Sequence, residues 1–328
     1  MRTRPADLPD SVVADALRSG WGLEPVSVGY LAVGFGSHHW RADVDGAAWF
    51  VTVDDLTARS DLAADPPGVV RRLRAALATA RAIHENGAAF VVAPIPTVGG
   101  DLVRRMGDRY AAAVYPYVDG RRHAYGEVLG AAERRSILEM VAALHATPEP
   151  IRAEALVDDM EIPQRKGLRE ALDRPGSRWD TGPYGEPARL LLADRAQDVA
   201  RLLDRHDRLA TQARGRRERM VLTHGEPHPG NLIETESGWR LVDWDTTLIA
   251  PPERDLWVVD SGDGSITAAY EAATGRPVLA SVLELYRLTW QLADIALYVA
   301  ELRHPHDDTE DIRESWTALR HALQHLLQ

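Results

Sequence analysis

The stretch HGEPHPGN at residues 224–231 decides between two very different structures for the centre of this chain. Its histidines, His224 and His228, stand one helical turn apart, as they would in a zinc-binding helix. Pro227 and Pro229 argue against that helix, because proline removes a backbone donor and obstructs the preceding turn. The stretch is therefore expected to be a loop, with His224 bracing it through hydrogen bonds.

A β-hairpin is predicted directly after this loop. The run NLIETESGWRLVDWD at 231–245 has a turn signal centred on Ser237, which sets Asn231 and Asp243 opposite each other with Cβ atoms about 5 Å apart. An amide oxygen and a carboxylate aimed at one point suit Mg²⁺, which takes its other ligands from waters and nucleotide phosphates. Glu226 would lie beside that metal and accept a proton from an attacking hydroxyl. The alternative is an ordinary surface hairpin with scattered polar residues.

Composition limits the possible function classes. The chain has 328 residues and 45% hydrophobic content, enough for one large domain or two lobes. The absence of cysteine excludes a disulfide framework, a thiolate nucleophile and a zinc–sulfur site. A net charge of −11 disfavours nucleic acid and membrane partners and favours a cationic small molecule, or it serves solubility alone. With no signal peptide or membrane span recognised, a cytoplasmic protein is expected.

The N-terminal part is expected to be a small antiparallel sheet packed on one helix. Short β-branched or aromatic runs separated by turn signals predict strands at 26–33, 38–44, 48–53, 90–94 and 110–115. A helix is predicted over 68–86, where apolar residues recur at helical spacing and Gly87 follows as a stop.

The remainder of the chain is expected to be mainly helical, which gives an α+β fold with two lobes. The predicted helices are about 126–146, 188–213, 265–274, 278–302 and 310–327. Residues 116–120 are interpreted as a hinge between a lobe at 1–115 and a lobe at 121–328. Residues 148–187, rich in proline and glycine, are predicted to be a long irregular connection that serves as a substrate lid or as structural padding.

Five segments between residues 93 and 256 carry a family resemblance. They are LTHGEPHPGN (222–231), VDWD (242–245), APPERDL (250–256), VYPYVDGR (114–121) and APIPT (93–97). Through them the chain resembles the aminoglycoside phosphotransferases, and within that family the spectinomycin phosphotransferase type. The resemblance implies a two-lobed protein-kinase-like fold with ATP or GTP and Mg²⁺ in the cleft. It also implies transfer of the terminal phosphoryl group to a hydroxyl of a small molecule, such as an aminoglycoside or aminocyclitol.

The resemblance also assigns roles to residues of the loop and the hairpin. Glu226 stands where the family has its catalytic Asp, Asn231 where it binds one magnesium ion, and Asp243 where it holds the other. Asp255, in the segment after the hairpin, is expected to brace the loop from below. Together with His224, these residues form the predicted catalytic and metal-binding group.

The nucleotide side is expected in the first lobe and at the hinge. Its candidate residues are Gly34, Gly36, Ser37, His38, Thr52, Tyr115 and Tyr117. The GFGS turn at 34–37 could close backbone N–H groups over phosphates, or it could be a plain hairpin turn. The two tyrosines match the linker whose backbone meets the nucleotide base in the family.

Two departures from the family pattern bear on activity. Glu226 is one methylene longer than the usual Asp, which moves its oxygens by about 1.5 Å. Thr52 stands where the family has a lysine that grips the phosphates, and the predicted helix after it has no interior Glu to pair with such a lysine. His38, His39 and Arg41 are the candidates for a replacement cation. The alternative hypothesis is a nucleotide-binding pseudokinase, and a third is a small-metabolite kinase of the same fold.

The acceptor side is expected in the second lobe. Its candidate residues are Glu226, Asp245, Trp257 and Asp260, since carboxylates beside aromatic faces suit protonated amino groups. The alternative is that Trp257 belongs to the core and that Asp260 and Asp263 belong to a loop. The aromatic residues Tyr286, Trp290 and Tyr298 fall at helical spacing and are interpreted as packing residues.

Overall fold

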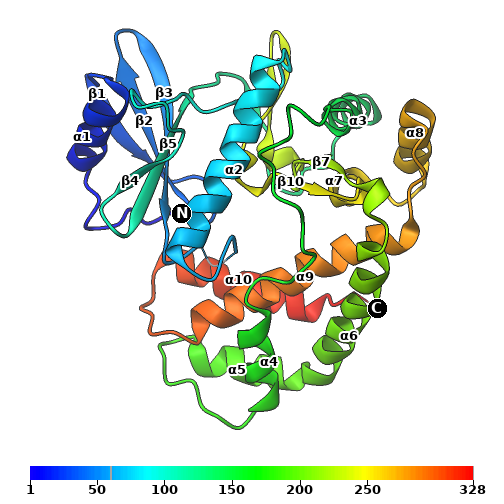
Figure 1. The fold of residues 1–328 in the computed structure, drawn as a ribbon. Helices are drawn as coiled ribbons and strands as arrows, with labels where there is room; N and C mark the ends of the chain where they lie inside the picture. Colours follow the sequence, from blue (N-terminus) through cyan, green and yellow to red (C-terminus); the bar gives the residue numbers. More distant parts are fainter. Residues whose placement is uncertain (60, 328) are drawn as a thin grey trace.

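The computed structural model describes residues 1–59 and 61–327, and it confirms the expected α+β architecture with a sheet-containing lobe followed by a mainly helical one (Figure 1). The first lobe holds an antiparallel sheet. In sheet order its strands are β1 (Ser27–Leu31), β2 (His38–Val44), β3 (Ala47–Asp55), β5 (Tyr110–Pro116) and β4 (Arg104–Met106).

Two helices cover the two faces of this sheet (Figure 1). Along β3, Val51 and Val53 point to one face and are almost fully buried against α1 (Asp10–Trp21). Thr52 alternates with them and therefore points to the opposite face, where α2 (Pro66–Glu85) packs. The predicted helix over 68–86 is thus confirmed, and the Asp65 carboxylate caps it by accepting the Gly68 N–H at 2.6 Å.

The predicted strand at 90–94 is wrong. Only Val91 forms an isolated bridge, to Leu241, while the Val92 N–H donates to the Leu241 carbonyl at 3.1 Å. The backbone of this segment is therefore used to pair with the hairpin of the second lobe. Pro94 and Pro96 follow and cannot donate to a ladder, so the short strand β4 takes the edge of the sheet instead.

The second lobe is mainly helical. Its helices are α3 (Ala131–His145), α4 (Arg165–Asp173), α5 (Gly185–Asp194), α6 (Ala196–Arg214), α7 (Glu253–Val259), α8 (Ser265–Thr274), α9 (Ala280–Leu302) and α10 (Glu310–Gln324). Its short strands are β6 (Arg121–Arg122), β7 (Val221–Thr223), β8 (Leu232–Thr235), β9 (Gly238–Leu241) and β10 (Leu248–Ala250). Strands β6, β8 and β9 form one sheet, and β7 pairs with β10.

Two predicted helices and the predicted irregular segment differ from the structure. The helix expected over 126–146 begins only at Ala131, and the helix expected over 188–213 is two helices that break at Arg195. The segment 148–187 is not wholly irregular, because α4 lies within it. Its residues 156 and 158 are also held to β10 by backbone hydrogen bonds to Ile249 of 2.8 and 2.9 Å. This part of the segment is therefore fixed to the second lobe by backbone hydrogen bonds.

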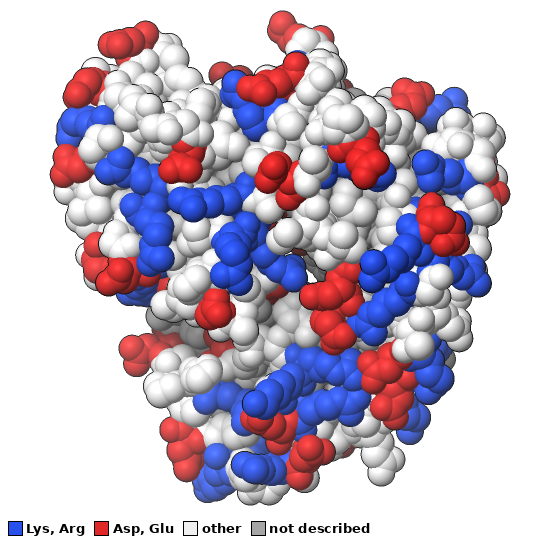
Figure 2. Space-filling view, in the orientation of Figure 1, with Lys and Arg blue, Asp and Glu red and all other residues white. Residues whose placement is uncertain are grey.

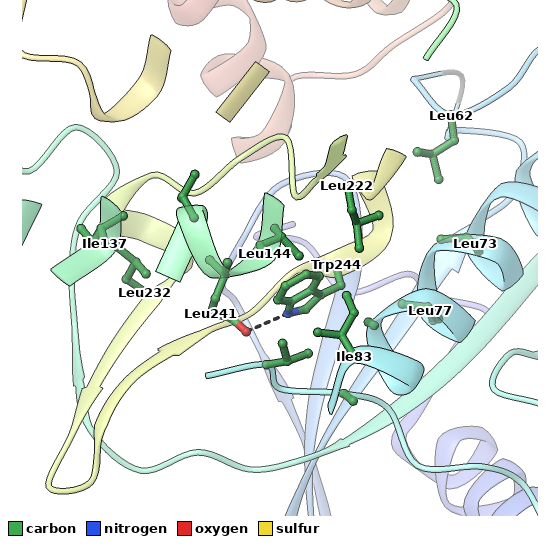
Figure 3. Packing of buried hydrophobic residues seen from close by; sticks show 14 of the residues in the cluster. Leu62, Leu73, Leu77, Ile83, Ile137, Leu144, Leu222, Leu232, Leu241 and Trp244 are labelled. Carbon is green, nitrogen blue, oxygen red and sulfur yellow. Dashed lines mark hydrogen bonds between the residues drawn. The ribbon is translucent and has the colours of Figure 1, made fainter. Parts of the chain in front are cut away.

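A buried tryptophan joins the two lobes. Trp244 is fully buried, its indole N–H donates to the Leu241 carbonyl at 2.8 Å, and it lies among leucines of both lobes (Figure 3). The labelled neighbours include Leu73 and Leu77 of α2 and Leu222 of β7. Because the residues on both sides of Trp244 are aspartates, this anchor fixes where two carboxylates enter the space between the lobes.

The surface carries charges of both signs, and the helices are those of a protein without a membrane-spanning helix among the described residues. Acidic and basic side chains are interspersed over the face shown in Figure 2, which is also hollowed between its upper and lower parts. Among residues 1–59 and 61–327, every helix is too short or too polar to cross a bilayer.

Candidate functional site

A cavity of about 1810 Å³ lies between the lobes and brings most of the predicted site residues together. The glycine turn at 34–37, the loop at 225–231 and the segment at 243–248 contribute to its wall. The opposite wall comes from residues 156–164, α9 and α10. The lining includes Gly34, Gly36, Ser37, Glu226, Asn231, Asp243, Asp245 and Trp257.

The loop that carries Glu226 is held from below by a buried carboxylate. Asp255 accepts the N–H of His224 at 3.0 Å and the N–H of Gly225 at 2.6 Å, and the His145 ring contacts it at 3.1 Å. These contacts keep the pKa of Asp255 below its usual value, against the effect of burial. Gly225 has a φ of 102°, and a Cβ there would lie 2.5 Å from the Arg254 guanidinium, so the turn requires glycine.

His224 is a bracing residue in this geometry. Its Nε2 atom lies 3.0 Å from the Val242 carbonyl, and its Nδ1 accepts the N–H of Glu226 at 3.2 Å. Burial lowers the pKa of His224 to about 4, so the ring is neutral at physiological pH. A neutral ring with one donor and one acceptor nitrogen fits these two contacts. His224 therefore links the loop to the hairpin without carrying a charge.

The register predicted for the hairpin is wrong by one residue. Leu232 pairs with Leu241 and Thr235 with Gly238, so the turn is centred between residues 236 and 237. Asn231 consequently lies opposite Val242, whose N–H donates to the Asn231 carbonyl at 3.0 Å. Asp243 comes one residue later and has a left-handed backbone with φ of 68°. The backbone conformation at this residue, rather than strand pairing, thus brings its side chain to the cavity.

Asn231 and Asp243 offer oxygen ligands suited to a divalent cation. The Asn231 side-chain N–H₂ donates to the Glu226 carbonyl at 3.0 Å. Desolvation by the surrounding protein, with repulsion from Asp245 and Glu226, raises the pKa of Asp243 well above its usual value. No hydrogen bond or ion pair to another described residue compensates that carboxylate. A cation beside it would supply the missing compensation.

The two oxygen donors do not form a complete metal site. No group of three or more His, Asp or Glu side chains in the described part of the chain is arranged to hold a metal ion. A magnesium ion at Asn231 and Asp243 would therefore need ligands from phosphates and waters, as this ion commonly does. The donor set fits a metal that arrives with a nucleotide.

Of the predicted nucleotide residues, the glycine turn lines the cavity and the others do not. Gly34 and Gly36 have φ of 71° and 82°, and the Ser37 hydroxyl donates to Asp54 at 2.7 Å. The remaining four, which are outside the lining, are His38, Thr52, Tyr115 and Tyr117. The backbone N–H of Tyr117 is already used, because it donates to the Ala48 carbonyl at 3.1 Å.

The three residues expected to replace the missing lysine do not place a cation in the cavity. Burial lowers the pKa of His39 to about 3, and burial also lowers the pKa of His38, which contacts the Tyr30 hydroxyl at 3.2 Å. Arg41 lies outside the cavity lining, bound to Asp43 at 3.0 Å. These predictions are therefore not supported by the geometry.

Sequence reasoning missed Arg59, which is only 4% exposed and lines the cavity. Its guanidinium contacts the carboxylates of Asp54, Asp61 and Asp245 and donates to the Ser37 hydroxyl at 3.0 Å. Burial opposes the charge, but the three carboxylates outweigh it and raise the pKa of Arg59 well above its usual value. Burial raises the pKa of Asp245 to about 6, although Arg59 acts in the opposite direction.

The wall formed by α9 also holds residues that sequence reasoning misjudged. Trp290 and Tyr298, expected to be packing residues, line the cavity, and so does Asp294 between them. Other rings line the same cavity, since Trp257 and Tyr125 are centred 5.5 and 6.4 Å from Trp290, and Tyr125 and Tyr298 interact electrostatically with Asp294. The spacing of Trp290, Asp294 and Tyr298 by four residues places them on one helix face, a signal that was present in the sequence.

Asp294 differs electrostatically from the acidic residues predicted for this wall. Burial, reinforced by the nearby Glu226, raises the pKa of Asp294 to about 7. No hydrogen bond or ion pair joins it to another described residue. By contrast, Asp260 pairs with Arg287 at 2.6 Å, and Asp263 accepts the Ser265 N–H at 2.9 Å. Both lie outside the cavity lining, so the structure does not bring Asp260 to the site.

The chain is similar in sequence and in fold to known phosphotransferases. A family model described as the phosphotransferase enzyme family matches residues 32–286. The chain is 30% identical over 255 residues to protein StrN of Streptomyces griseus, covering 74% of each chain. Its fold is similar to spectinomycin phosphotransferase APH(9)-Ia in complex with ADP and spectinomycin, with TM-score 0.73, 16% identity and 97% of both chains covered. It is also similar to a microcompartment-associated aminopropanol kinase, with TM-score 0.60, 14% identity and 95% of both chains covered.

Proposed function

Because the chain belongs to the phosphotransferase enzyme family, we propose that it transfers the terminal phosphoryl group of ATP or GTP to a hydroxyl of a cationic small molecule. One observation carries the proposal. A single cavity is lined on one wall by Glu226, Asn231 and Asp243, and on another by Asp294 among aromatic rings. The first wall suits a metal-bound phosphate and a proton acceptor, and the second suits a cationic acceptor.

In this proposal the nucleotide enters between the lobes. Residues 1–115 form the nucleotide-binding lobe, 116–120 the hinge, and 121–328 the lobe that carries the metal ligands and the acceptor pocket. The glycine turn at 34–37 covers the phosphates, and Asn231 and Asp243 hold Mg²⁺. The bound ion would neutralise phosphate charge, which the uncompensated carboxylate of Asp243 supports.

The chemical step assigned to the chain's own residues is proton acceptance and positioning. Glu226 takes the proton of the attacking hydroxyl, and its loop is held by His224 and Asp255. The Glu226 carboxylate lies 3.5 Å from the His228 ring and is about 30% exposed, so an acceptor hydroxyl can reach it from the cavity. The support of the loop fixes the backbone from which the longer side chain of Glu226 extends.

The acceptor is expected to be an amino alcohol that carries a positive charge near its hydroxyl. Asp294 has no ion-pair partner within residues 1–59 and 61–327, and the rings of Tyr125, Trp257 and Trp290 can contact an ammonium group. The structural relatives include a spectinomycin phosphotransferase and an aminopropanol kinase. An acceptor panel should therefore contain aminocyclitols, aminoglycosides and small amino alcohols.

The test is release of nucleoside diphosphate from ATP or GTP with Mg²⁺, with and without each acceptor. We expect acceptor-dependent turnover by the wild-type protein. Glu226→Gln should lower kcat by about 10²–10⁴-fold, the usual contribution of a general base, while nucleotide affinity is retained. Glu226→Asp tests the longer base, since faster turnover would mean that the loop is spaced for the shorter residue.

Two results would contradict the transfer reaction. One is a Glu226→Gln variant that turns over at the wild-type rate. The other is a wild-type protein that binds nucleotide with Mg²⁺ yet releases no diphosphate with any member of the panel. That second result would favour the nucleotide-binding pseudokinase, for which Thr52 at the family's lysine position is the motivating observation.

A further inference from the structure

The chain lacks the lysine through which the proposed function would normally hold its nucleotide phosphates. Its single lysine, Lys166, lies on the exposed side of α4 and does not line the cavity. No other lysine in the sequence can therefore take the role of the one that Thr52 replaces. Phosphate groups in a closed site still require a positioned cation or a set of donors, so an arginine is the remaining side chain of permanent charge.

Arg59 lies beside the place where that lysine would act. Thr52 and Asp54 point to the same face of β3, because they alternate with the buried Val51 and Val53. Two residues along a strand span about 7 Å. The guanidinium of Arg59 contacts the carboxylate of Asp54, so its charge lies against this face of the strand.

Arg59 also lies between the two parts of the site that would hold phosphates. Its Nη1 donates to the Ser37 hydroxyl of the glycine turn at 3.0 Å. Its Nη2 donates to Asp245 at 2.7 Å, two residues after the proposed metal ligand Asp243. The guanidinium therefore contacts both the glycine turn and the segment that carries Asp243. A triphosphate bound between these two parts would lie against it.

The acidic neighbours of Arg59 would do what the absent glutamate of α2 does elsewhere. Asp61 is bound by two nitrogens of Arg59, Nε at 3.0 Å and Nη2 at 2.8 Å, which fixes the plane of the guanidinium. The helix α2 has only Glu85 as an acidic residue, and that residue ends it. The cation and its orienting acids therefore both come from the end of β3 and the loop after it.

We propose that Arg59 is the phosphate-binding cation of this protein, oriented by Asp54 and Asp61, and that its Nη2 exchanges Asp245 for a phosphate oxygen when nucleotide binds. The inference rests on the proposed function, since it names a further binding residue of the same site. The exchange is feasible because three carboxylates share one guanidinium, and a phosphate is a stronger partner for its planar fork.

The experiment compares the affinity of the folded protein for a nucleoside triphosphate and for its nucleoside. The ligands are MgATP and adenosine, or MgGTP and guanosine if the wild-type protein prefers guanine. Arg59→Gln should weaken triphosphate binding by about 10- to 100-fold, as expected for loss of a charge-assisted hydrogen bond, and leave nucleoside binding within about 2-fold. Arg59→Lys should give a smaller loss, because it keeps the charge and loses the fork.

Two controls separate binding from folding. Arg72→Gln removes another arginine that lines the cavity, one paired with Asp159 at 3.4 Å, and it should leave both affinities unchanged. If Arg59→Gln does not fold, the double variant R59Q/D54N removes one charge of each sign and keeps the net charge of the cluster. This double variant is then measured in place of the single one.

Three outcomes would overturn parts of the argument, and they can be told apart. Equal weakening of triphosphate and nucleoside binding in a folded Arg59 variant would mean a structural role only. Unchanged triphosphate affinity in that variant would mean that Arg59 does not contact phosphates. A wild-type protein that binds neither MgATP nor MgGTP would instead contradict the proposed function itself.

Discussion

The two walls of the cavity differ in whether their charged side chains are paired within the protein. On the wall proposed to bind the nucleotide, here called the nucleotide wall, Arg59 is surrounded by Asp54, Asp61 and Asp245, so a cation and its acids are already paired before any ligand binds. On the wall proposed to bind the acceptor, here called the acceptor wall, Asp294 interacts with Tyr125 and Tyr298 and has no partner of opposite charge among the described residues. The difference indicates that the nucleotide wall neutralises its charges within the protein. The acceptor wall leaves its charge for the ligand to neutralise.

The largest effect is expected from Asp243→Asn, which removes the carboxylate proposed to hold the metal on the nucleotide wall. Stabilisation of transition-state charge by a bound metal is worth several kcal/mol, so turnover should fall by about 10³-fold or more. Because this buried carboxyl group has no ion-pair partner in the described part of the chain and its ionised form is disfavoured there, the fold should not be destabilised. Diphosphate release and thermal unfolding of the variant check both expectations.

Glu234→Gln is the matched control for this variant. Glu234 lies on the same hairpin, pairs with Arg121 at 3.5 Å and is 45% exposed, away from the cavity. Its loss should leave turnover within about 2-fold, since exposed ion pairs contribute little. Equal activity in the Asp243 variant and this control would contradict the proposal that Asp243 binds the metal ion.

The loop and the general fold could be predicted because local chemistry determines them. Pro227 and Pro229 exclude a helix at 224–231 whatever surrounds them, and the alternation along β3 fixes which residues are buried. The hairpin was also recognisable from its turn residues. Its register was not, because a shift of one residue leaves the same turn signal, and no local pattern marks the left-handed backbone that brings Asp243 to the cavity.

The residues that were missed depend on contacts between distant parts of the chain. Arg59 approaches Asp245 across 186 positions of sequence, and no local pattern marks that pair. Asp294 could have been found, since it shares a helix face with Trp290 and Tyr298. An acid between two aromatic residues on one face is unusual in a packed core, where charges are rarely left without partners. That feature separates a cavity wall from a core.

A smaller effect, and one confined to the acceptor wall, is expected from Asp294→Asn. The substitution keeps the shape of the side chain and removes its charge, so the KM for a cationic acceptor should rise by about 10- to 100-fold. The KM for the nucleotide should stay within about 2-fold, because Asp294 lies on the other wall. Steady-state kinetics with each substrate varied in turn measure both values.

Asp159→Asn is the matched control on that side of the cavity. Asp159 also lines the cavity, but it pairs with Arg72 and its side chain is 58% exposed. A general loss of negative charge would raise the KM for the acceptor equally in both variants. That result would show that the field of the whole cavity attracts the acceptor and that Asp294 has no special place.

The smallest effect is on stability, and its sign depends on pH. The pKa of Asp294 is raised to about 7 in the folded protein by burial and by Glu226, whereas an unfolded Asp has a pKa near about 3.9. Between these two values the folded state binds the proton more tightly, so this group's contribution to the free energy of unfolding falls as pH rises. Above pH 7 the folded protein must carry the unfavourable ionised form, while well below about pH 3.9 both states are protonated.

Asp294→Asn removes this penalty, so the variant should melt higher than the wild-type protein at pH 8, with a difference that shrinks by pH 5. Asp294 interacts electrostatically with Glu226, Tyr125 and Tyr298, and burial raises the pKa of both tyrosines. Glu226→Gln should therefore narrow the difference, because it removes the repulsion that helps to raise the pKa. Thermal unfolding at pH 5 and pH 8 measures it for the three proteins. If the difference in melting temperature is the same at both pH values, the substitution stabilises the protein by packing. The ionised form of Asp294 would then carry no energetic penalty in the folded state.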